Sequence, residues 1–201
     1  DRLGAQGHAR GRQAIAKLVV RPEQKEQSKA ALATGTKAQA LISKKIAALK
    51  AQTSLLAYTK FTMPDPEAPD DVTRSLYDAR EFHEAVAAAL ERCVVDQEFQ
   101  NLILVMGPRH GKTELATKRL TAWLHCKHPR WDLIVATYSD EKAWEFGGDT
   151  RSILQSPQHK AVFPEYALRR GSTAKDFMQS VHGGKILFKG RGGALTGSCM
   201  H

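Results

Sequence analysis

The sequence predicts an α/β fold in which a mainly parallel sheet is flanked by helices, with a basic helical segment in front of it. Residues 102–106, LILVM, have the length and composition of a buried parallel strand. A glycine-containing loop and a helical pattern follow, and residues 133–137, LIVAT, form a second apolar run. Strand, helix and strand in this order predict a parallel βαβ unit with a right-handed crossover. We therefore expect a helical segment at 1–57 and the sheet-containing domain at 58–201.

The basic character of the chain belongs to its N-terminal part. Residues 1–60 carry 12 Lys and Arg against 3 Asp and Glu, whereas residues 61–201 carry 18 of each, so the net charge of +9 arises before residue 61. Such asymmetry indicates contact with nucleic acid or another acidic surface. A solvated helix face explains the same charge equally well.

Residues 36–57 have the pattern of a long amphipathic helix. One apolar stripe recurs at helical spacing, and the lysines lie largely off it; the stripe comprises Leu41 or Ile42, Ile46, Leu49, Thr53 and Leu56. This helix could contact DNA or another subunit. Docking of the stripe onto the core of the same chain is the interpretation we favour slightly.

A proline-rich connector separates this helix from the next. Pro64, Pro66 and Pro69 exclude regular structure between them. Thr73 is a suitable N-cap for a helix over about 74–95. The buried face of that helix is predicted to hold Leu76, Phe82, Val86, Leu90 and Cys93, with His83 in a structural role.

The loop after the first strand has the composition of a phosphate-binding P-loop. It comprises Gly107, Pro108, Arg109, His110, Gly111, Lys112 and Thr113, and a helical pattern follows. Backbone N–H groups at such a helix start converge on an anion, a lysine reaches the β and γ oxygens of a nucleotide, and a threonine hydroxyl ligates Mg²⁺. The usual first glycine would stand at Met106, one place before Gly107. The alternative is a chance Gly-Lys-Thr in a basic protein.

The carboxyl end of the second strand should lie near this loop, because ligands of parallel sheets bind at that edge. Thr137, Tyr138, Ser139 and Asp140 occupy it. Ser139 or Asp140 is also placed to cap a helix over about 140–155, which is the role we favour.

Several classes of protein are excluded by composition. No apolar run approaches ~18 residues, so no membrane span is expected, and no secretory signal is apparent. Three widely spaced cysteines indicate a reducing compartment rather than a disulfide framework or zinc site. The run His125-Cys126-Lys127-His128 is interpreted as surface, since adjacent helical residues do not face one point.

Four segments together resemble the large terminase subunit of tailed bacteriophages, the motor that pumps DNA into the phage head. The loop PRHGKT, the block ATYSDEKAWEFGGDTRSILQSP, the stretch VFPEYAL and the segment GGKILFKGRGGALTG are similar to the family's segments in order and spacing. The resemblance runs from about Tyr58 to Thr196. It implies a P-loop NTPase core.

The resemblance also implies roles for residues. ATP and Mg²⁺ would be the cofactors, with Lys112 and Arg109 acting on the phosphates and Thr113 holding the metal. Tyr58 or Phe61, upstream of the loop, would meet the adenine; both rings packed in the core is the alternative.

Two departures from the family pattern affect catalysis. Many terminases have an arginine after Leu-Thr-Gly, where this chain has Ser198, so Arg191 or Arg109 would have to serve as the charge-stabilising finger. The family's acidic (Walker B) strand and its nuclease domain would lie beyond His201. We therefore expect this chain to bind ATP without necessarily hydrolysing it.

The resemblance implies double-stranded DNA, the portal protein and the small terminase subunit as partners, and a homo-oligomeric ring on the portal. The expected location is the host cytoplasm, transiently on the procapsid, without secretion. A helicase-like translocating P-loop ATPase is the alternative enzyme. A non-catalytic module, whose basic N-terminal segment binds DNA or a partner protein, is the alternative outside enzymes.

Overall fold

The computed structural model describes residues 22–98, 100–171 and 174–191, with side chains from residue 36 onward. The chain divides into two compact units, Asp1–Ala38 and Gln39–His201. Helix α1, Pro22–Thr53, runs from the first unit into the second. The boundary predicted after residue 57 falls inside helix α2, Leu55–Phe61, within the second unit.

The helix predicted at 36–57 is interrupted at Ser54. The Ser54 side chain caps α2 by accepting a bond from the Ala57 amide, which favours a new helix start at this residue. The face of α1 that packs on the domain is made of small residues, with Ala48 and Ala51 buried. The helix therefore docks on the core, as we favoured, but not through the predicted stripe. Of that stripe Ile42, Ile46 and Leu49 are at least half exposed, whereas Leu56, which lies in α2, packs against the core. The alanine face makes this contact, and the aliphatic stripe does not, because small side chains let helix backbones approach closely.

The connector has no regular structure, as its prolines predict. Helix α3, Glu81–Val94, begins later than the predicted 74–95. Thr73 does not cap it, because its hydroxyl bonds Asp71 at 2.7 Å. This bond from Thr73 lowers the pKa of the Asp71 carboxyl. His83 caps the start of the helix instead, because its Nδ1 accepts a hydrogen bond from the Arg80 amide at 2.9 Å.

The predicted strand at 102–106 is not formed. The segment lies outside the sheet, and its alternate side chains Ile103 and Val105 are 88% and 87% exposed. A buried strand needs backbone partners, and none of the described strands pairs with this one. The first strand of the predicted βαβ unit is therefore wrong for this structure. After the loop come a π-helix, η1, Thr113–Arg119, and helix α4, Leu120–Lys127.

The described strands form one mixed sheet in the order β1-β3-β2, with bounds β1 Leu133–Thr137, β2 Phe177–Gln179 and β3 Lys185–Gly190. The prediction of β1 at 133–137 is confirmed. It pairs in parallel with β3, from Leu133 opposite Ile186 to Thr137 opposite Gly190, and β2 pairs antiparallel with β3. The central position of β3 explains its unbroken buried run from Ile186 to Phe188.

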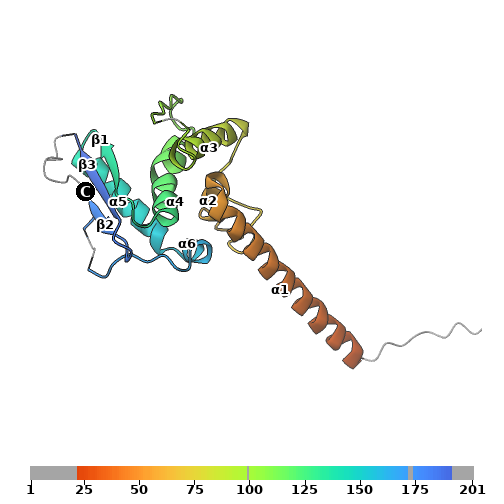
Figure 1. Ribbon diagram of the computed structural model, residues 1–201. Helices are drawn as coiled ribbons and strands as arrows, with labels where there is room; N and C mark the ends of the chain where they lie inside the picture. The colour runs from red at the N-terminus through yellow and green to blue at the C-terminus, as the bar shows by residue number, and fades with distance from the viewer. Residues whose placement is uncertain (1–21, 99, 172–173, 192–201) are drawn as a thin grey trace, which may run out of the picture. The chain divides into compact units, whose positions relative to one another are not determined.

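Helix α5, Asp140–Gln155, confirms the helix predicted at 140–155 and packs on β1 and β3 (Figure 1). Its close approach requires Gly147, where a Cβ would overlap the Lys175 carbonyl oxygen. Helix α6, Pro157–Val162, follows with Ser156 as N-cap. The α5 face and the sheet thereby enclose one side of the core.

The core centres on Trp123 of α4, which is fully buried. Its indole N–H donates to the Ala51 carbonyl of α1 at 2.9 Å, which ties α4 to the end of α1. Other large apolar side chains of the same core cluster are also almost without exposure, among them Leu55, Tyr58, Leu115, Met178, Ile186 and Phe188.

Buried polar groups form a second feature of the core. The Tyr58 hydroxyl lies 2.7 Å from His159 Nδ1, and Cys126 Sγ lies 3.4 Å from His159 Nε2. His125 Nδ1 lies 2.7 Å from the Tyr166 hydroxyl. The interpretation of His125 as a surface residue is wrong, because its side chain is fully buried against Tyr166. Burial lowers the pKa of both histidines to about 4.

None of the described helices combines the length and the apolar character that a membrane crossing requires.

Candidate functional site

The loop from Gly107 to Thr113 joins the extended segment at 102–106 to η1. Arg109 and Gly111 have positive φ angles of 61° and 68°. Glycine adopts this conformation freely, whereas arginine does so at a cost of roughly 1 kcal/mol or more. Two left-handed residues so close together turn the chain sharply before the helix starts at Lys112, which is already helical.

Side chains from α3 and the connector hold the loop in place. His83 Nδ1 accepts the Arg80 amide, so the proton of a neutral ring sits on Nε2, which donates to the His110 carbonyl at 2.9 Å. Tyr77 packs on Gly111, where a Cβ would stand 2.9 Å from the tyrosine hydroxyl oxygen. Burial and the Glu114 charge raise the pKa of Tyr77 to about 12. Gly111 is therefore required both for its φ angle and for this contact.

Within the loop, the His110 ring turns back on the chain. Its Nδ1 lies 2.7 Å from the Pro108 carbonyl oxygen, so this nitrogen must carry a proton and donate. The ring also limits space at Gly107, where a Cβ would meet it at 3.1 Å. The side chains from Gly107 to His110 remain exposed.

The start of the helix after the loop presents hydrogen-bond donors without protein acceptors. Among the described residues, the amides of Gly111 and Lys112 donate to no carbonyl or side chain. Lys112 is half-buried and Arg109 is exposed, and neither forms an ion pair within the described ranges. The Thr113 side chain is exposed beside them. Unpaired N–H groups and a lysine at a helix N-terminus are suited to an anion.

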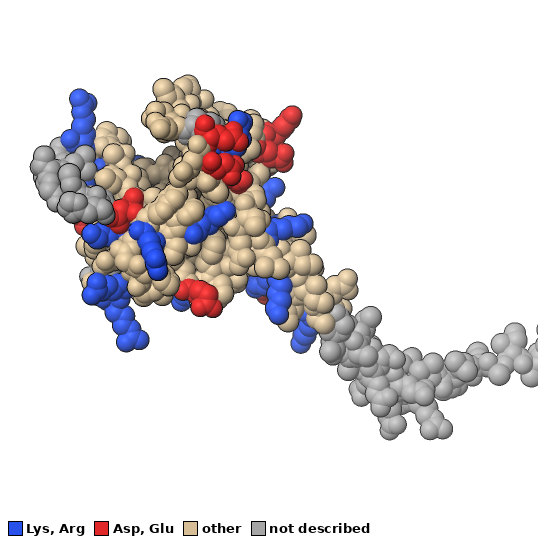
Figure 2. Space-filling view, in the orientation of Figure 1, with Lys and Arg blue, Asp and Glu red and all other residues tan. Residues whose placement is uncertain are grey.

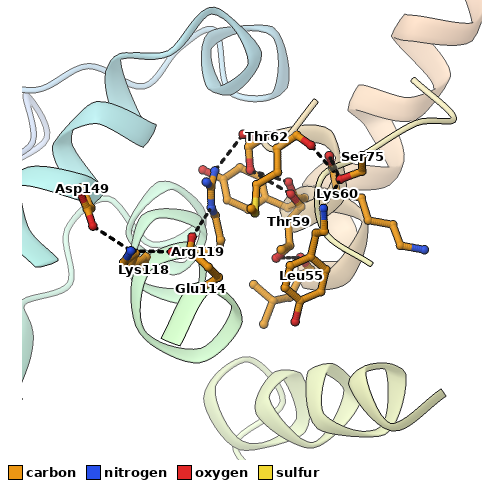
Figure 3. Close-up of polar contacts among 12 residues, drawn as sticks. Leu55, Thr59, Lys60, Thr62, Ser75, Glu114, Lys118, Arg119 and Asp149 are labelled. Carbon is orange, nitrogen blue, oxygen red and sulfur yellow. Dashed lines mark hydrogen bonds and ion pairs between the residues drawn. The ribbon is translucent and has the colours of Figure 1, made fainter. Parts of the chain in front are cut away.

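An ion network lies directly behind this helix start. Lys118 Nζ lies 2.5 Å from Glu114 and 2.8 Å from Asp149 of α5, while Arg119 donates to the Thr62 carbonyl at 3.0 Å (Figure 3). Burial by itself would lower the pKa of Lys118, but its bonds to Asp149 and Glu114 raise it overall. Burial lowers the pKa of Arg119. Glu114 is therefore committed to internal cations and is not a free base for the loop.

We expect Glu114→Gln to lower the free energy of unfolding by about 1–3 kcal/mol, because Lys118 and buried Arg119 lose a carboxylate. Urea unfolding at neutral pH measures it. The matched control is Glu145→Gln, which breaks an exposed pair with Lys142 at 2.7 Å and should cost no more than about 0.5 kcal/mol. Equal effects of the two substitutions would mean that the network contributes no more than a surface pair.

Tyr58 and Phe61, expected near an adenine, lie in the core. Tyr58 is fully buried and bonded to His159, and Phe61 is 9% exposed. This arrangement corresponds to the alternative in which both rings pack internally. Contact with a nucleotide base remains a prediction for both.

Residues at the carboxyl end of β1 serve local structure. Ser139 caps α5 by accepting the Lys142 amide, which confirms its predicted capping role. The Asp140 carboxylate accepts the Gly190 amide at 2.8 Å and joins the ends of β1 and β3. Thr137 donates to the Ser139 carbonyl, while the Tyr138 side chain is 79% exposed.

A cavity of about 610 Å³ opens beside the loop. The sequence did not indicate most of its lining, which includes Tyr77, Arg80, Phe82, His83, Arg109 and His110. Phe82 was predicted on the buried face of a helix from its spacing, and His83 was given a structural role. Only the fold shows that the N-terminus of α3 brings them to the loop.

No group of three or more His, Cys, Asp or Glu in the described part of the chain is placed to hold a metal ion. The carboxylate next to Thr113 in the chain, Glu114, is paired with Lys118. Arg191 is exposed directly after β3. The Leu-Thr-Gly segment and Ser198 lie outside the described residues.

In comparisons with known proteins, no family model, curated protein or solved structure matches this chain.

Proposed function

We propose that this chain binds Mg-ATP through the loop at 107–113, as the nucleotide-binding region of a DNA-packaging motor of the large-terminase type. One observation carries the proposal. Lys112 has no acidic partner among the described residues and stands at a helix start where the Gly111 and Lys112 amides have no protein acceptor. The type of motor is proposed from the resemblance of the loop sequence to that of the large terminase subunit. Its partners under this proposal are double-stranded DNA, the portal protein, the small terminase subunit and further copies in a ring.

The residues of the loop fit a polyphosphate. The two amides and the Lys112 ammonium bind phosphate oxygens, and the Thr113 hydroxyl is the ligand this chain offers to Mg²⁺. Arg109, which is exposed on the loop and lines the cavity beside it, adds positive charge at the same anion. When bound, ATP supplies the phosphoanhydride bond that water cleaves. The cavity lined by Tyr77, Phe82 and Arg80 offers aromatic and cationic surface to the rest of the nucleotide.

Hydrolysis needs a carboxylate that positions water. Asp78 and Glu114 line the cavity beside the loop, and each is paired with a cation, Asp78 with Arg80 at 2.8 Å and Glu114 with Lys118. Glu114 is the nearest in sequence, and Lys118 holds it at 2.5 Å. We therefore propose nucleotide binding for this chain and turnover for the intact motor, in which an acidic strand supplies the missing groups.

Lys112→Ala is expected to weaken Mg-ATP binding by roughly 100-fold, the loss of a charged hydrogen bond to phosphate. Titration calorimetry with Mg-ATP and a non-hydrolysable analogue measures it. Lys160→Ala, an exposed lysine on α6, is the matched control and should bind as the unaltered chain does. Equal affinity of Lys112→Ala and the unaltered chain, or no binding by either, would contradict the proposal.

A further inference from the structure

A groove of about 350 Å³ lies between α1 and α2, at a distance in sequence from the loop. From α1, Ile46, Ala47 and Lys50 line it, and from α2, Ala57, Lys60 and Phe61. These positions share one face of each helix, since they are three or four residues apart. The floor is apolar, and a lysine from each helix lines the groove. We call this the α1–α2 groove.

An exposed apolar stripe borders the groove. Ile42, Ile46 and Leu49 are 58%, 50% and 61% exposed. They recur at i, i+4 and i+7, so they form a single row on α1, and Ile46 belongs to both the row and the groove. No other part of the described chain covers them. A row of large aliphatic side chains beside an apolar groove is the composition of a protein-binding face.

The two lysines of the groove have no acidic partner among the described residues. Neither Lys50 nor Lys60 forms an ion pair with an acid among the described residues, whereas neighbouring Lys44 is paired with Asp70 at 3.1 Å. Charged groups around an apolar centre set the orientation and choice of a partner more than its affinity. Carboxylates are the groups that would complement them.

The observations favour a protein partner over nucleic acid or a second copy. On the face shown in Figure 2, Lys and Arg side chains are scattered among acidic and uncharged surface. The groove itself is lined by two lysines, Lys50 and Lys60, and otherwise by uncharged residues, whereas a phosphate backbone calls for a continuous basic surface. A symmetric dimer through this face would bring the same lysines of two copies into one interface. The aliphatic floor of the groove also offers a phosphate neither positive charge nor hydrogen-bond donors.

We propose that the α1–α2 groove and the stripe of Ile42, Ile46 and Leu49 bind an amphipathic helix of a partner protein that carries carboxylates beside its apolar face. One apolar side chain of the partner enters the groove, others cover the stripe, and its carboxylates pair with Lys50 and Lys60. This is the helix-in-groove mode of recognition. It is independent of the nucleotide proposal, because none of these residues belongs to the loop or to its cavity.

The test uses the full chain and a fluorescent 20-residue helical peptide with leucines at i, i+3, i+4 and i+7, flanked by glutamates. A second peptide has lysine at every glutamate position. By fluorescence anisotropy, we expect the acidic peptide to bind at least about 10-fold more tightly than the basic one. Ile46→Gln should weaken binding by at least about 10-fold. Val181→Gln, at another exposed aliphatic residue, is the matched control and should have no effect.

Further variants separate apolar docking from charge. Leu49→Gln should also weaken binding, and Lys50→Glu with Lys60→Glu should reverse the preference so that the basic peptide binds better. Binding that is insensitive to Ile46→Gln and Leu49→Gln would reduce the effect to general charge attraction and overturn the proposal. Displacement of the peptide by duplex DNA would identify a nucleic-acid surface instead. A dimer in sedimentation that Ile46→Gln dissociates would assign the face to a second copy, and either result overturns the proposal.

Discussion

Gly147→Ala is expected to destabilise the domain by about 3 kcal/mol or more, the scale of overpacking against a part that cannot yield. The added methyl group would overlap the Lys175 carbonyl oxygen and touch the Phe188 ring at 3.3 Å. Phe188 lies in central strand β3, and Lys175 leads into β2. Relief of the overlap would require α5 to separate from the sheet.

The neighbouring residue provides a matched control. Gly148 lies in the same helix with nothing within 4 Å of an added Cβ. Gly148→Ala should therefore stabilise the protein by about 0.5–1 kcal/mol, the gain of alanine over glycine in a helix. Thermal unfolding of both variants by circular dichroism measures the contrast. A Gly147→Ala protein as stable as Gly148→Ala would show that α5 does not pack on the sheet as described.

The stability of the fold is expected to fall steeply as the pH drops from about 6.5 to about 4. Burial lowers the pKa of His125 and of His159 from 6.5 to about 4, and for His159 the charges of Arg119 and Lys160 act in the same direction. Between pH 6.5 and pH 4, these two imidazoles are therefore protonated in the unfolded chain but neutral in the folded chain. The contribution of the two neutral histidines to the free energy of unfolding is fully present above pH 6.5. It is lost as the pH falls to 4, by roughly 3 kcal/mol for each histidine.

Urea unfolding at several pH values between 8 and 4 tests this dependence. His159→Gln should be less stable at pH 8, because Tyr58 loses its partner, yet its stability should fall less between pH 7 and pH 5. His182→Gln, at an exposed histidine, should retain the slope of the unaltered chain. Stability that is flat from pH 7 to pH 5 in the unaltered protein would exclude buried neutral histidines.

Elements with strong local signals could be predicted from the sequence. The strand at 133–137 and the helix at 140–155 were both correct, because an apolar run and a capping residue, Ser139, mark them within a few residues. A cap acts within one turn of the backbone, so neighbouring residues suffice to locate it.

Elements that depend on distant partners could not be predicted in this way. The run at 102–106 has the composition of a buried strand, but composition does not supply the neighbouring strand that burial requires. The start of α3 is decided by His83, which bonds the Arg80 amide and the loop. The exposed stripe of α1 likewise follows from a choice between two faces, of which the alanine face packs more closely.

The candidate site divides along the same line. The loop from Gly107 to Thr113 is contiguous, so its sequence pattern alone identified it. Tyr77 and His83 reach the loop from a connector and a helix more than 20 residues upstream, through contacts that only the fold creates. For Tyr58 the resemblance implied contact with adenine, with packing in the core as the alternative; in the structure its ring is buried and bonded to His159.

The buried indole of Trp123 makes the core visible to spectroscopy. Trp123 has no exposed surface and bonds the Ala51 carbonyl, while Trp144 is 46% exposed. The third tryptophan, Trp131, is half-buried and stacks on His128. The three indoles are therefore shielded to different degrees, and quenchers dissolved in water reach Trp144 but not Trp123. Emission from Trp123 reports whether α1 remains attached to α4. Separation of these helices would expose the ring to water and shift its emission maximum to longer wavelength.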